Sequence, residues 1–491
     1  MKPSTIGVSC LSHDAALAAV TGDTVAFAAH AERYSRRKND PALHPALLAD
    51  AAAYWGSPGE LVFYERPVLK RARQLRAGQL RLALTPERTR DRLHGLPGLR
   101  GLPVRYVGHH LAHAAGGYFT SPFREAAVVV ADAIGEWDTL TVWHARGREL
   151  RRIHTTRYPH SLGLFYSAFT QRAGLKPNEE EYIFMGMAAY GEPRHRRVIE
   201  QEVLADQRAP RFRLRRNLHR GLGDWRPELR DGPDLAASVQ AITEDYLDGL
   251  FAWVRRTVPC ANLVYSGGVA LNCLFNGRLA RTGRFDDIWI MPNPGDAGSA
   301  LGAALARRRE FVDWTGPYLG HDIRRPLDPA AVARALVDHT VVGVANGRAE
   351  YGPRALGNRS LLADPRGAAV KERVNAIKRR QRFRPFAPIV LEERARDFFA
   401  MPCDATPYMQ FVVDCRDPAS YPAICHVDGT SRVQTVRKDQ NPVIHAVITE
   451  FERLTGCPML LNTSLNIRGM PLVNTWQDAL DFAERYRVPV F

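Results

Sequence analysis

Two histidines and two aspartates have the residue types and spacing that a metal site requires. His109 and His113 lie four residues apart, so a helix would place both imidazoles on one face. Asp132 and Asp296 each follow an apolar segment that has the composition of a buried strand. Imidazole and carboxylate ligands suit iron, manganese or zinc, and their chemical softness does not decide among these metals. Because paired histidines often only pack or cap, this spacing alone is a moderate signal.

Two glycine-rich turns indicate contacts with phosphate. The segments 266–272 (SGGVALN) and 292–298 (PNPGDAG) each stand between an expected strand and an expected helix. Glycine lets backbone N–H groups approach a phosphate at a helix N-terminus. Each turn is a weak signal, since such turns often only reverse the chain. Together in one α/β unit they favour a nucleotide-binding core.

The C-terminal third sets basic side chains among glycine, proline and apolar residues, and a Ser-x-Asn pair follows them. These residues are Arg354, Lys378, Arg384, Arg432, Ser464 and Asn466. Arginine forks with nearby hydroxyl and amide groups are typical of a pocket for a polyphosphate or an acyl phosphate. A single arginine usually belongs to a solvated surface, but several in this setting are harder to explain that way.

The elements that must position these groups follow a doubled plan. An apolar strand at 5–11 leads through His13 and Asp14 into a second strand, and the strand at 126–131 leads through Asp132 into another. This plan is typical of a duplicated ribonuclease-H-like fold, although two unrelated hairpins explain the pattern equally well. Helices and strands alternate afterwards, including a helix at 236–258. Residues 312–338 have the composition of a domain junction, and a strand at 340–345 opens a second α/β unit.

Composition and charge exclude several classes of protein. The 491 residues carry a net charge of +15, and two windows hold the whole excess. Residues 66–105 contain eleven Lys and Arg against two acids, and residues 194–230 contain eleven against five. Because the positive charge is confined to these two segments, it argues against a generally basic surface of the kind that binds nucleic acid. The seven cysteines are scattered without a C-x-x-C, which indicates a reducing compartment, and no apolar run approaches about 18 residues. We therefore expect a cytoplasmic protein without a signal peptide or membrane span.

In combination, these motifs resemble the O-carbamoyltransferases of the nodulation and tobramycin type. The resemblance covers about residues 5–475 and rests on HDAA, HHLAHAA, YSGGVALNC, MPNPGDAGSALGAA, EYGPRALGNRSLLADPR and LNTSLN. It implies an α/β protein in which a duplicated ribonuclease-H-like domain (actin/TsaD-like, ASKHA) spans residues 1–325. A YrdC-like α/β domain would follow at 335–472, and the tail of about 473–491 would pack back on the first domain.

The resemblance also implies the reaction, which is ATP-dependent O-carbamoyl transfer. The YrdC-like part would make carbamoyl adenylate from carbamoyl phosphate and ATP, with Mg²⁺ accompanying the ATP. The first domain, with iron(II) or another divalent metal, would pass the carbamoyl group to a small-molecule alcohol such as a polyketide or an aminoglycoside. No nucleic-acid or membrane partner is implied, and a homodimer is only weakly indicated.

Carried over residue by residue, the resemblance assigns a role to each candidate. The metal ligands would be His109, His113, Asp132 and Asp296. His13 and Lys38 would act beside the acceptor and the scissile bond. Nucleotide contacts would come from Gly267, Gly268 and Asn272. Carbamoyl phosphate and ATP would meet Arg354, Lys378, Arg384, Arg432, Ser464 and Asn466.

Two other functions compete with this assignment. A transferase of the tRNA threonylcarbamoyladenosine type has a related fold, and the basic windows would suit tRNA. That system normally divides its activities between two chains, whereas both sets of motifs occur here on one. A catalytically silent nucleotide-binding protein would be expected to lose the metal or arginine sets, and both are present.

Overall fold

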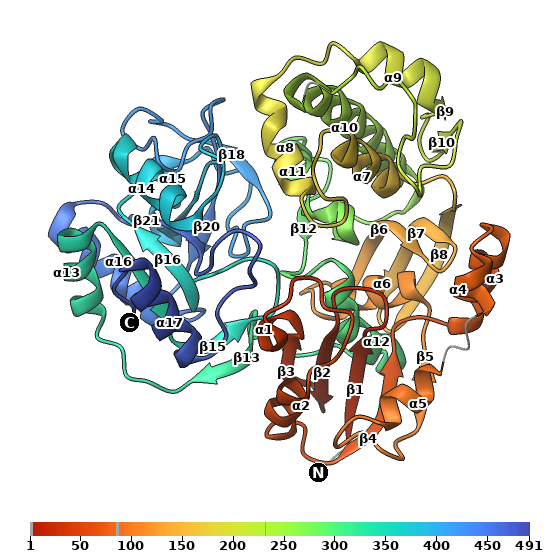
Figure 1. Ribbon diagram of the computed structural model, residues 1–491, viewed down its shortest axis with the longest axis horizontal. Coiled ribbons are helices and arrows are strands. Elements are labelled where there is room, and N and C mark those ends of the chain that lie inside the picture. The colour runs from red at the N-terminus through yellow and green to blue at the C-terminus, as the bar shows by residue number, and fades with distance from the viewer. Residues whose placement is uncertain (1–2, 85–87, 231) are drawn as a thin grey trace.

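The computed structural model describes residues 3–84, 88–230 and 232–491, and its N-terminal part contains two five-stranded sheets (Figure 1). The first sheet has the order β3 (Thr24–His30), β2 (Ala16–Thr21), β1 (Ser4–Ser9), β4 (Pro58–Phe63), β5 (Val104–Tyr106). The second has the order β8 (Glu149–Arg157), β7 (Asp138–Arg146), β6 (Glu125–Gly135), β11 (Asn262–Ser266), β12 (Asp287–Trp289).

The two sheets repeat one topology. In each, the first strand in the chain pairs antiparallel with the second and parallel with the fourth, and the fifth strand continues the parallel edge. The expected doubling of strand, acid and strand is therefore present as two equivalent units. One detail differs from the expectation, because Asp132 lies inside β6, which continues past a register shift to Gly135.

Two helices lie back to back between the sheets and position the polar groups at their ends. They are α6 (His109–Phe119), which packs on the second sheet, and α12 (Ser299–Arg308), which packs on the first. Their backbones touch through glycine, since a Cβ on Gly302 would lie 2.0 Å from the carbonyl oxygen of Ala112. A Cβ on Gly7 of β1 would likewise lie 1.9 Å from the Ala300 oxygen. Only glycine permits these approaches.

The outer face of the second sheet is covered by α7 (Leu162–Arg172), α8 (Glu181–Met187) and α10 (Gly232–Thr257). The predicted apolar spacing of α10 is confirmed at five positions, since Leu235, Val239, Ile242, Tyr246 and Leu250 are buried, whereas the sixth, Trp253, is partly exposed. The remaining helices of this part are α1 (Glu32–Ser35), α2 (Pro45–Ala52), α3 (Pro67–Arg76), α4 (Leu80–Leu84), α5 (Thr89–His94), α9 (Arg196–Val203) and α11 (Cys273–Arg281), and two short strands are β9 (Leu204–Asp206) and β10 (Arg213–Leu214).

The C-terminal unit is built on a third five-stranded sheet, which is antiparallel except between its last two strands. Its order is β14 (Val341–Ala345), β16 (Arg359–Ala363), β21 (Met459–Ser464), β17 (Ala387–Leu391), β20 (Gln434–Val436). Two helices, α13 (Pro329–His339) and α16 (Pro442–Thr455), pack on each other and on this sheet. Smaller elements are β13 (Tyr318–Ile323), β15 (Gly347–Glu350), α14 (Ala368–Lys378), α15 (Ala395–Phe398), β18 (Val412–Asp414), β19 (Thr430–Arg432) and α17 (Trp476–Tyr486).

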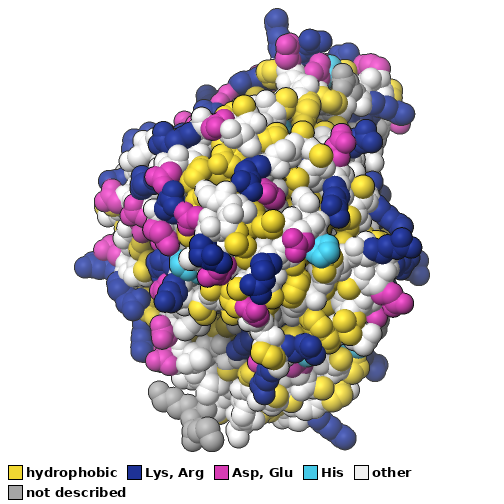
Figure 2. Space-filling model, turned by 90° about the vertical axis from the view of Figure 1, so that its left-hand side faces the viewer, with side chains coloured by type: hydrophobic (Ala, Val, Ile, Leu, Met, Phe, Trp, Pro, Cys, Tyr) yellow, Lys and Arg dark blue, Asp and Glu magenta, His cyan; other side chains and the backbone are white. Residues whose placement is uncertain are grey.

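On the face shown in Figure 2, basic and acidic side chains are interspersed.

Two segments have more structure than the sequence indicated. The expected junction at 312–338 contains β13 and α13, and β13 pairs antiparallel with β15. The tail, expected to return to the first domain, mainly covers β14 instead, where Val490 forms a parallel bridge with Gly343 and α17 packs alongside. It meets the N-terminal part at Arg36, which lies 3.8 Å from Asp478 of α17 and donates hydrogen bonds to the Pro471 and Leu472 carbonyls just before the tail. The domain bounds themselves stay a prediction.

A buried arginine ties these C-terminal pieces together. Arg359 has no exposed surface, and its guanidinium donates to five backbone carbonyls, those of His321, Asn346, Gly347, Asn358 and Asn474. The acceptors come from β13, from the turn into β15 and its first residue, from the residue before β16, and from the tail. Burial lowers the pKa of Arg359 to about 10, which leaves the side chain charged at neutral pH.

We therefore predict that Arg359→Met lowers the free energy of unfolding by about 3 kcal/mol or more, because the buried carbonyls lose their donor. Denaturant unfolding followed by circular dichroism measures this change. Arg453→Met is the control, since that side chain on α16 is 65% exposed and its pair with Glu450 is worth about 0–1 kcal/mol. Equal unfolding midpoints for both variants would contradict the role given to Arg359.

Candidate functional site

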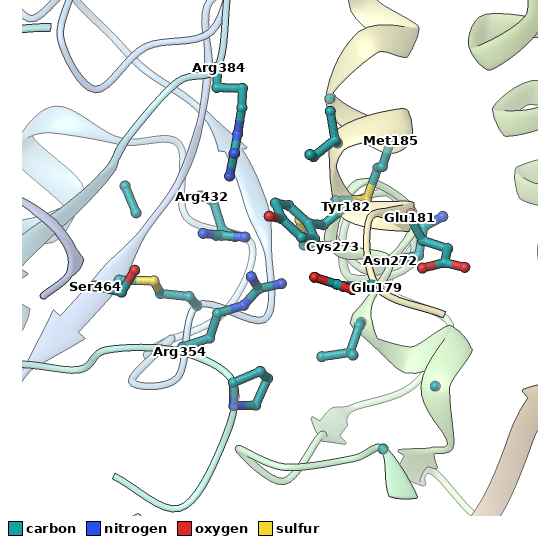
Figure 3. A pocket seen from close by; sticks show the side chains of 18 of the residues that line it. Glu179, Glu181, Tyr182, Met185, Asn272, Cys273, Arg354, Arg384, Arg432 and Ser464 are labelled. Atoms are coloured by element: carbon teal, nitrogen blue, oxygen red, sulfur yellow. The ribbon is translucent and has the colours of Figure 1, made fainter. Parts of the chain in front are cut away.

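A cavity of about 540 Å³ lies between the N-terminal part and the C-terminal unit, and it collects most of the predicted residues (Figure 3). All of the candidates line it except His109, His113 and Gly267. Its N-terminal wall is formed by the turn after β1, the end of β6, α8 and the start of α11. Its other wall is formed by loops around β16, β17, β19 and β21. A volume of this size is within the range of small-molecule sites.

The four predicted metal ligands converge at one end of the cavity. Their ligand atoms all lie within 4.8 Å of one another. His109 Nε2 lies 3.1 Å from His113 Nε2 and 3.2 Å from Asp132 Oδ2, and His113 Nε2 lies 3.2 Å from Asp296 Oδ1. Ligands about 2.1 Å from one ion stand roughly 3.0–3.4 Å apart, which these distances match. The donor set therefore fits a divalent cation of the iron, manganese or zinc type.

The electrostatics of this cluster also favour a cation. Burial opposes a charge on His109, but Asp296, Asp132 and Glu65 outweigh it and hold the pKa of His109 well above its usual range. The pKa of Asp132 is lowered to about 2, since the neighbouring histidines outweigh burial and the charge of Asp296. Carboxylates that stabilise a protonated imidazole in this buried position would also stabilise a metal ion bound in place of that proton.

His13 stands beside this cluster at the cavity edge. Its Nε2 lies 3.4 Å from Asp296 Oδ2, and its Nδ1 lies 3.0 Å from Asp14 Oδ2. Burial lowers the pKa of His13, but the hydrogen bond with Asp14 and the charges of Asp296 and Asp132 raise it to about 9. A cation held by Asp132 and Asp296 would offset those charges and return His13 toward its neutral form.

Lys38 lines the same cavity farther along. Its charge acts on the buried carboxyl group of Glu32. Burial alone would raise the pKa of Glu32, but the charge of Lys38, together with those of His30 and Arg33, lowers it. The charge of Lys38 also lowers the pKa of Lys378 on the facing wall, after burial and the charges of Arg380 and Arg384, so the Lys38 ammonium is close enough to act on both walls.

The opposite wall presents three arginines without acidic partners. Arg354, Arg384 and Arg432 project toward α8 and the start of α11 (Figure 3). Within the described chain none of them forms an ion pair with Asp or Glu, and Arg432 Nε is buried without a hydrogen-bond acceptor. Burial, followed by the charge of Arg432, lowers the pKa of Arg354 to about 9. Buried cations that repel one another in this way indicate a site for a polyanion.

Lys378 has a different environment from the three arginines. Its Nζ donates to the Ser464 carbonyl and lies 3.1 Å from Ser464 Oγ and 2.9 Å from Asn466 Oδ1. These acceptors satisfy the ammonium without a ligand. Lys378 therefore holds the loop after β21, and with it the polar side chains of Ser464 and Asn466, against the cavity.

The glycines in the turn after β11 are explained by contacts within the fold rather than by contacts with a ligand. Gly267 has φ +90° and a Cβ there would lie 2.2 Å from the Ala131 oxygen. The N–H of Gly268 donates to Asp132 Oδ1 at 3.3 Å. Asn272 lines the cavity, but its amide pairs with Gln240 in both directions and caps α11 at Phe275 N. The predicted nucleotide contacts of these three residues stay predictions.

Other lining residues were not among the candidates. Arg380 and Arg468 carry the same signal as the chosen arginines, basic side chains set among apolar and glycine residues. Arg468 pairs with Glu180 at 3.0 Å across the two walls. Tyr182 of α8 lies under the guanidinium of Arg384, 4.8 Å from it, and no sequence signal distinguishes it from a packing aromatic.

The two basic windows meet in space beside this site. Gln79 of the first window lies 2.9 Å from His219 of the second, side-chain nitrogen to ring nitrogen. Arg66 forms a bidentate pair with Glu136, next to the metal-ligand strand β6. Among the described residues, no helix has the length and apolar character needed to cross a bilayer.

Comparison with known proteins identifies the family. The profile described as Carbamoyltransferase N-terminus matches residues 98–305, and that described as Carbamoyltransferase C-terminus matches residues 333–491. An uncharacterized protein of Synechocystis sp. is 34% identical over 96% of this chain and 93% of its own length. Nodulation protein NolO of Bradyrhizobium diazoefficiens is 37% identical over 76% of this chain and 75% of its own.

A third relative has a name that states its reaction. The 3'-hydroxymethylcephem-O-carbamoyltransferase of Streptomyces clavuligerus is 33% identical over 67% of this chain and 66% of its own length. The two matched profiles include residues of both walls of the cavity, but the turn after β1 lies before the first of them. The chain belongs to the carbamoyltransferase family and is a transferase.

Proposed function

We propose that this chain is an ATP-dependent O-carbamoyltransferase that carbamoylates a hydroxyl group of a natural product. The observation that carries the proposal is a single cavity with a histidine–aspartate cluster at one end and three unpaired arginines on the facing wall. The names of the cephem enzyme and of the nodulation relative support a small-molecule alcohol as acceptor.

The proposed reaction has two steps, activation of the carbamoyl group and its transfer to the acceptor. Water and carbamoyl phosphate give carbamate and phosphate, and a carbamate oxygen attacks the α-phosphorus of ATP, which releases pyrophosphate and forms carbamoyl adenylate. The acceptor oxygen then attacks the carbamoyl carbon, the bond to AMP breaks, and the hydroxyl proton goes to a base. Mg²⁺ would accompany the ATP.

The residues of the cavity suit these steps. Arg354, Arg384 and Arg432 would neutralise the phosphates of ATP and carbamoyl phosphate, as cations do in phosphoryl transfer generally. Lys378 would keep Ser464 and Asn466 in place beside those phosphates. His13 in its neutral form would accept the acceptor proton, and Lys38 would stabilise charge on the departing AMP.

We assign the histidine–aspartate cluster to iron(II), with another divalent metal as the alternative. His109, His113, Asp132 and Asp296 would hold the ion. When bound, such an ion polarises the acyl donor and offsets phosphate charge.

The division of labour within the chain is also part of the proposal. The duplicated sheets, within residues 1–325, would form the TsaD-like part that transfers the carbamoyl group. The third sheet, within 335–472, would form the YrdC-like part that makes the adenylate. A cytoplasmic location and a homodimer stay predictions.

We predict that His113→Ala lowers the affinity for a divalent metal by at least about 100-fold, since it removes one of four ligands. Metal content of anaerobically purified protein and calorimetric titration with Mn²⁺ measure this. The control is His110→Gln, because His110 is equally buried on α6 but its Nδ1 bonds Thr141 Oγ1 at 2.9 Å, outside the cluster. Wild-type protein that takes up no divalent metal would refute the metal assignment.

We predict release of pyrophosphate from ATP that depends on carbamoyl phosphate, and an approximately 100-fold lower rate in Arg354→Gln. Arg382→Gln serves as the control, since Arg382 is exposed two residues from Arg384 and does not line the cavity. A coupled pyrophosphate assay gives both rates. Turnover that instead requires tRNA, threonine and bicarbonate would establish the tRNA-modifying alternative, and no turnover of ATP would favour a silent nucleotide-binding protein.

A further inference from the structure

A buried carboxylate outside the four-ligand cluster faces one of its histidines from behind. Glu65 follows β4, at the edge where the parallel strands β1 and β4 end, and only 5% of its surface is exposed. Its Oε1 lies 3.6 Å from His109 Nδ1, on the side of the ring opposite the cluster. His109 Nδ1 is buried and has no hydrogen-bond partner within the described chain, so Glu65 is the carboxylate that a small approach would bring to it.

The position of the cluster decides which ring nitrogen of His109 must carry a proton. His109 Nε2 faces His113, Asp132 and Asp296 at 3.1–3.3 Å, so this atom must offer a lone pair to any ion held there. The proton of the neutral ring is then on Nδ1. Glu65 is the carboxylate placed to accept it, and such partners fix the tautomer and orientation of metal-binding histidines.

Glu65 has a cationic partner of its own. Lys70 of α3 donates from Nζ to Glu65 Oε2 at 2.8 Å, and its side chain is 15% exposed. The same Nζ donates to Ser12 Oγ, in the residue before His13. One ammonium therefore fixes both the carboxylate behind His109 and the turn that carries His13. This contact also connects the first basic window to the site, because α3 lies within that window.

We propose that Glu65 and Lys70 are positioning residues, with Glu65 holding His109 in the metal-binding tautomer and Lys70 holding Glu65 and the Ser12 turn in register. The proposal rests on the metal site assigned above. Neither residue touches the reacting atoms, so their effect would first be visible in metal binding rather than in chemistry.

Metal-stripped protein titrated with Co²⁺ tests this directly, because the visible absorption of bound Co²⁺ reports both affinity and ligand geometry. We expect Glu65→Gln to weaken Co²⁺ binding about 10–100-fold and to change the band shape, since an amide can present N–H to Nδ1 and reverse the tautomer. Glu65→Asp, which keeps the carboxylate, should recover part of the affinity. Lys70→Met should also weaken Co²⁺ binding, because Glu65 loses its cationic partner. Lys70→Arg, which keeps a cation there, should restore part of the affinity.

The matched control is Glu136→Gln, which removes another buried carboxylate with an arginine partner at this edge of the site but contacts neither histidine. Thermal unfolding of the metal-free proteins distinguishes lost metal binding from lost folding, and Lys70→Met tests the pair if Glu65→Gln does not fold. Wild-type affinity and spectrum in Glu65→Gln and Lys70→Met would overturn the proposal. Wild-type protein that binds no Co²⁺ would remove the metal site and this inference together, whereas Co²⁺ binding without carbamoyl transfer would refute only the proposed function.

Discussion

The site depends on charges of opposite sign held apart on two facing walls. Asp132 and Asp296 have imidazoles but no Lys or Arg as ion-pair partners in the described chain, and Arg354, Arg384 and Arg432 across the cavity have no acidic partner there. If the walls touched, these groups would pair with each other. Because a buried charge without a partner destabilises a protein, ligands that supply the missing charges would stabilise the two walls. The proposed cation at one end and the proposed polyanion at the other would do this together.

Contacts away from the charged groups keep the walls at this separation. A Cβ on Gly277 of α11 would lie 2.1 Å from the Val412 carbonyl oxygen, so the two parts approach backbone to backbone. Asn276 Nδ2 donates to the Gln410 carbonyl at 3.0 Å. At the rim, Tyr190 donates to the Phe383 carbonyl at 2.9 Å. Since these contacts end on backbone groups, they hold the walls together whatever the ionisation of the residues that line the cavity.

Much of this site could be predicted from residue types and their spacing. The features that depend on contacts between residues far apart in the sequence could not. The convergence of the histidine–aspartate cluster could be predicted because His109 and His113 share a helix face and the two acids adjoin buried strand segments. The structure within 312–338 was not predicted, because β13 is a strand only through its partner β15 and the prolines and glycines around it resemble a linker. Asn272 resembled a ligand contact, but its amide is satisfied by Gln240, 32 residues away in sequence. Glu65, a single acid before Arg and Pro, has nothing in its local sequence to separate it from a solvated turn.

Duplication explains why residues so far apart in sequence form one centre. Equivalent units place α6 and α12 back to back, and Gly302 lets their backbones touch, so His113 meets Asp296 at 3.2 Å across 183 residues. The same arrangement brings the turn after β1, with His13, against Asp296 from the other unit. The proposed general base and the proposed cation site therefore share one carboxylate. Because Gly302 and Ala112 meet backbone to backbone, a side chain at position 302 would push α12 away from α6 and move Asp296 away from His113 and His13.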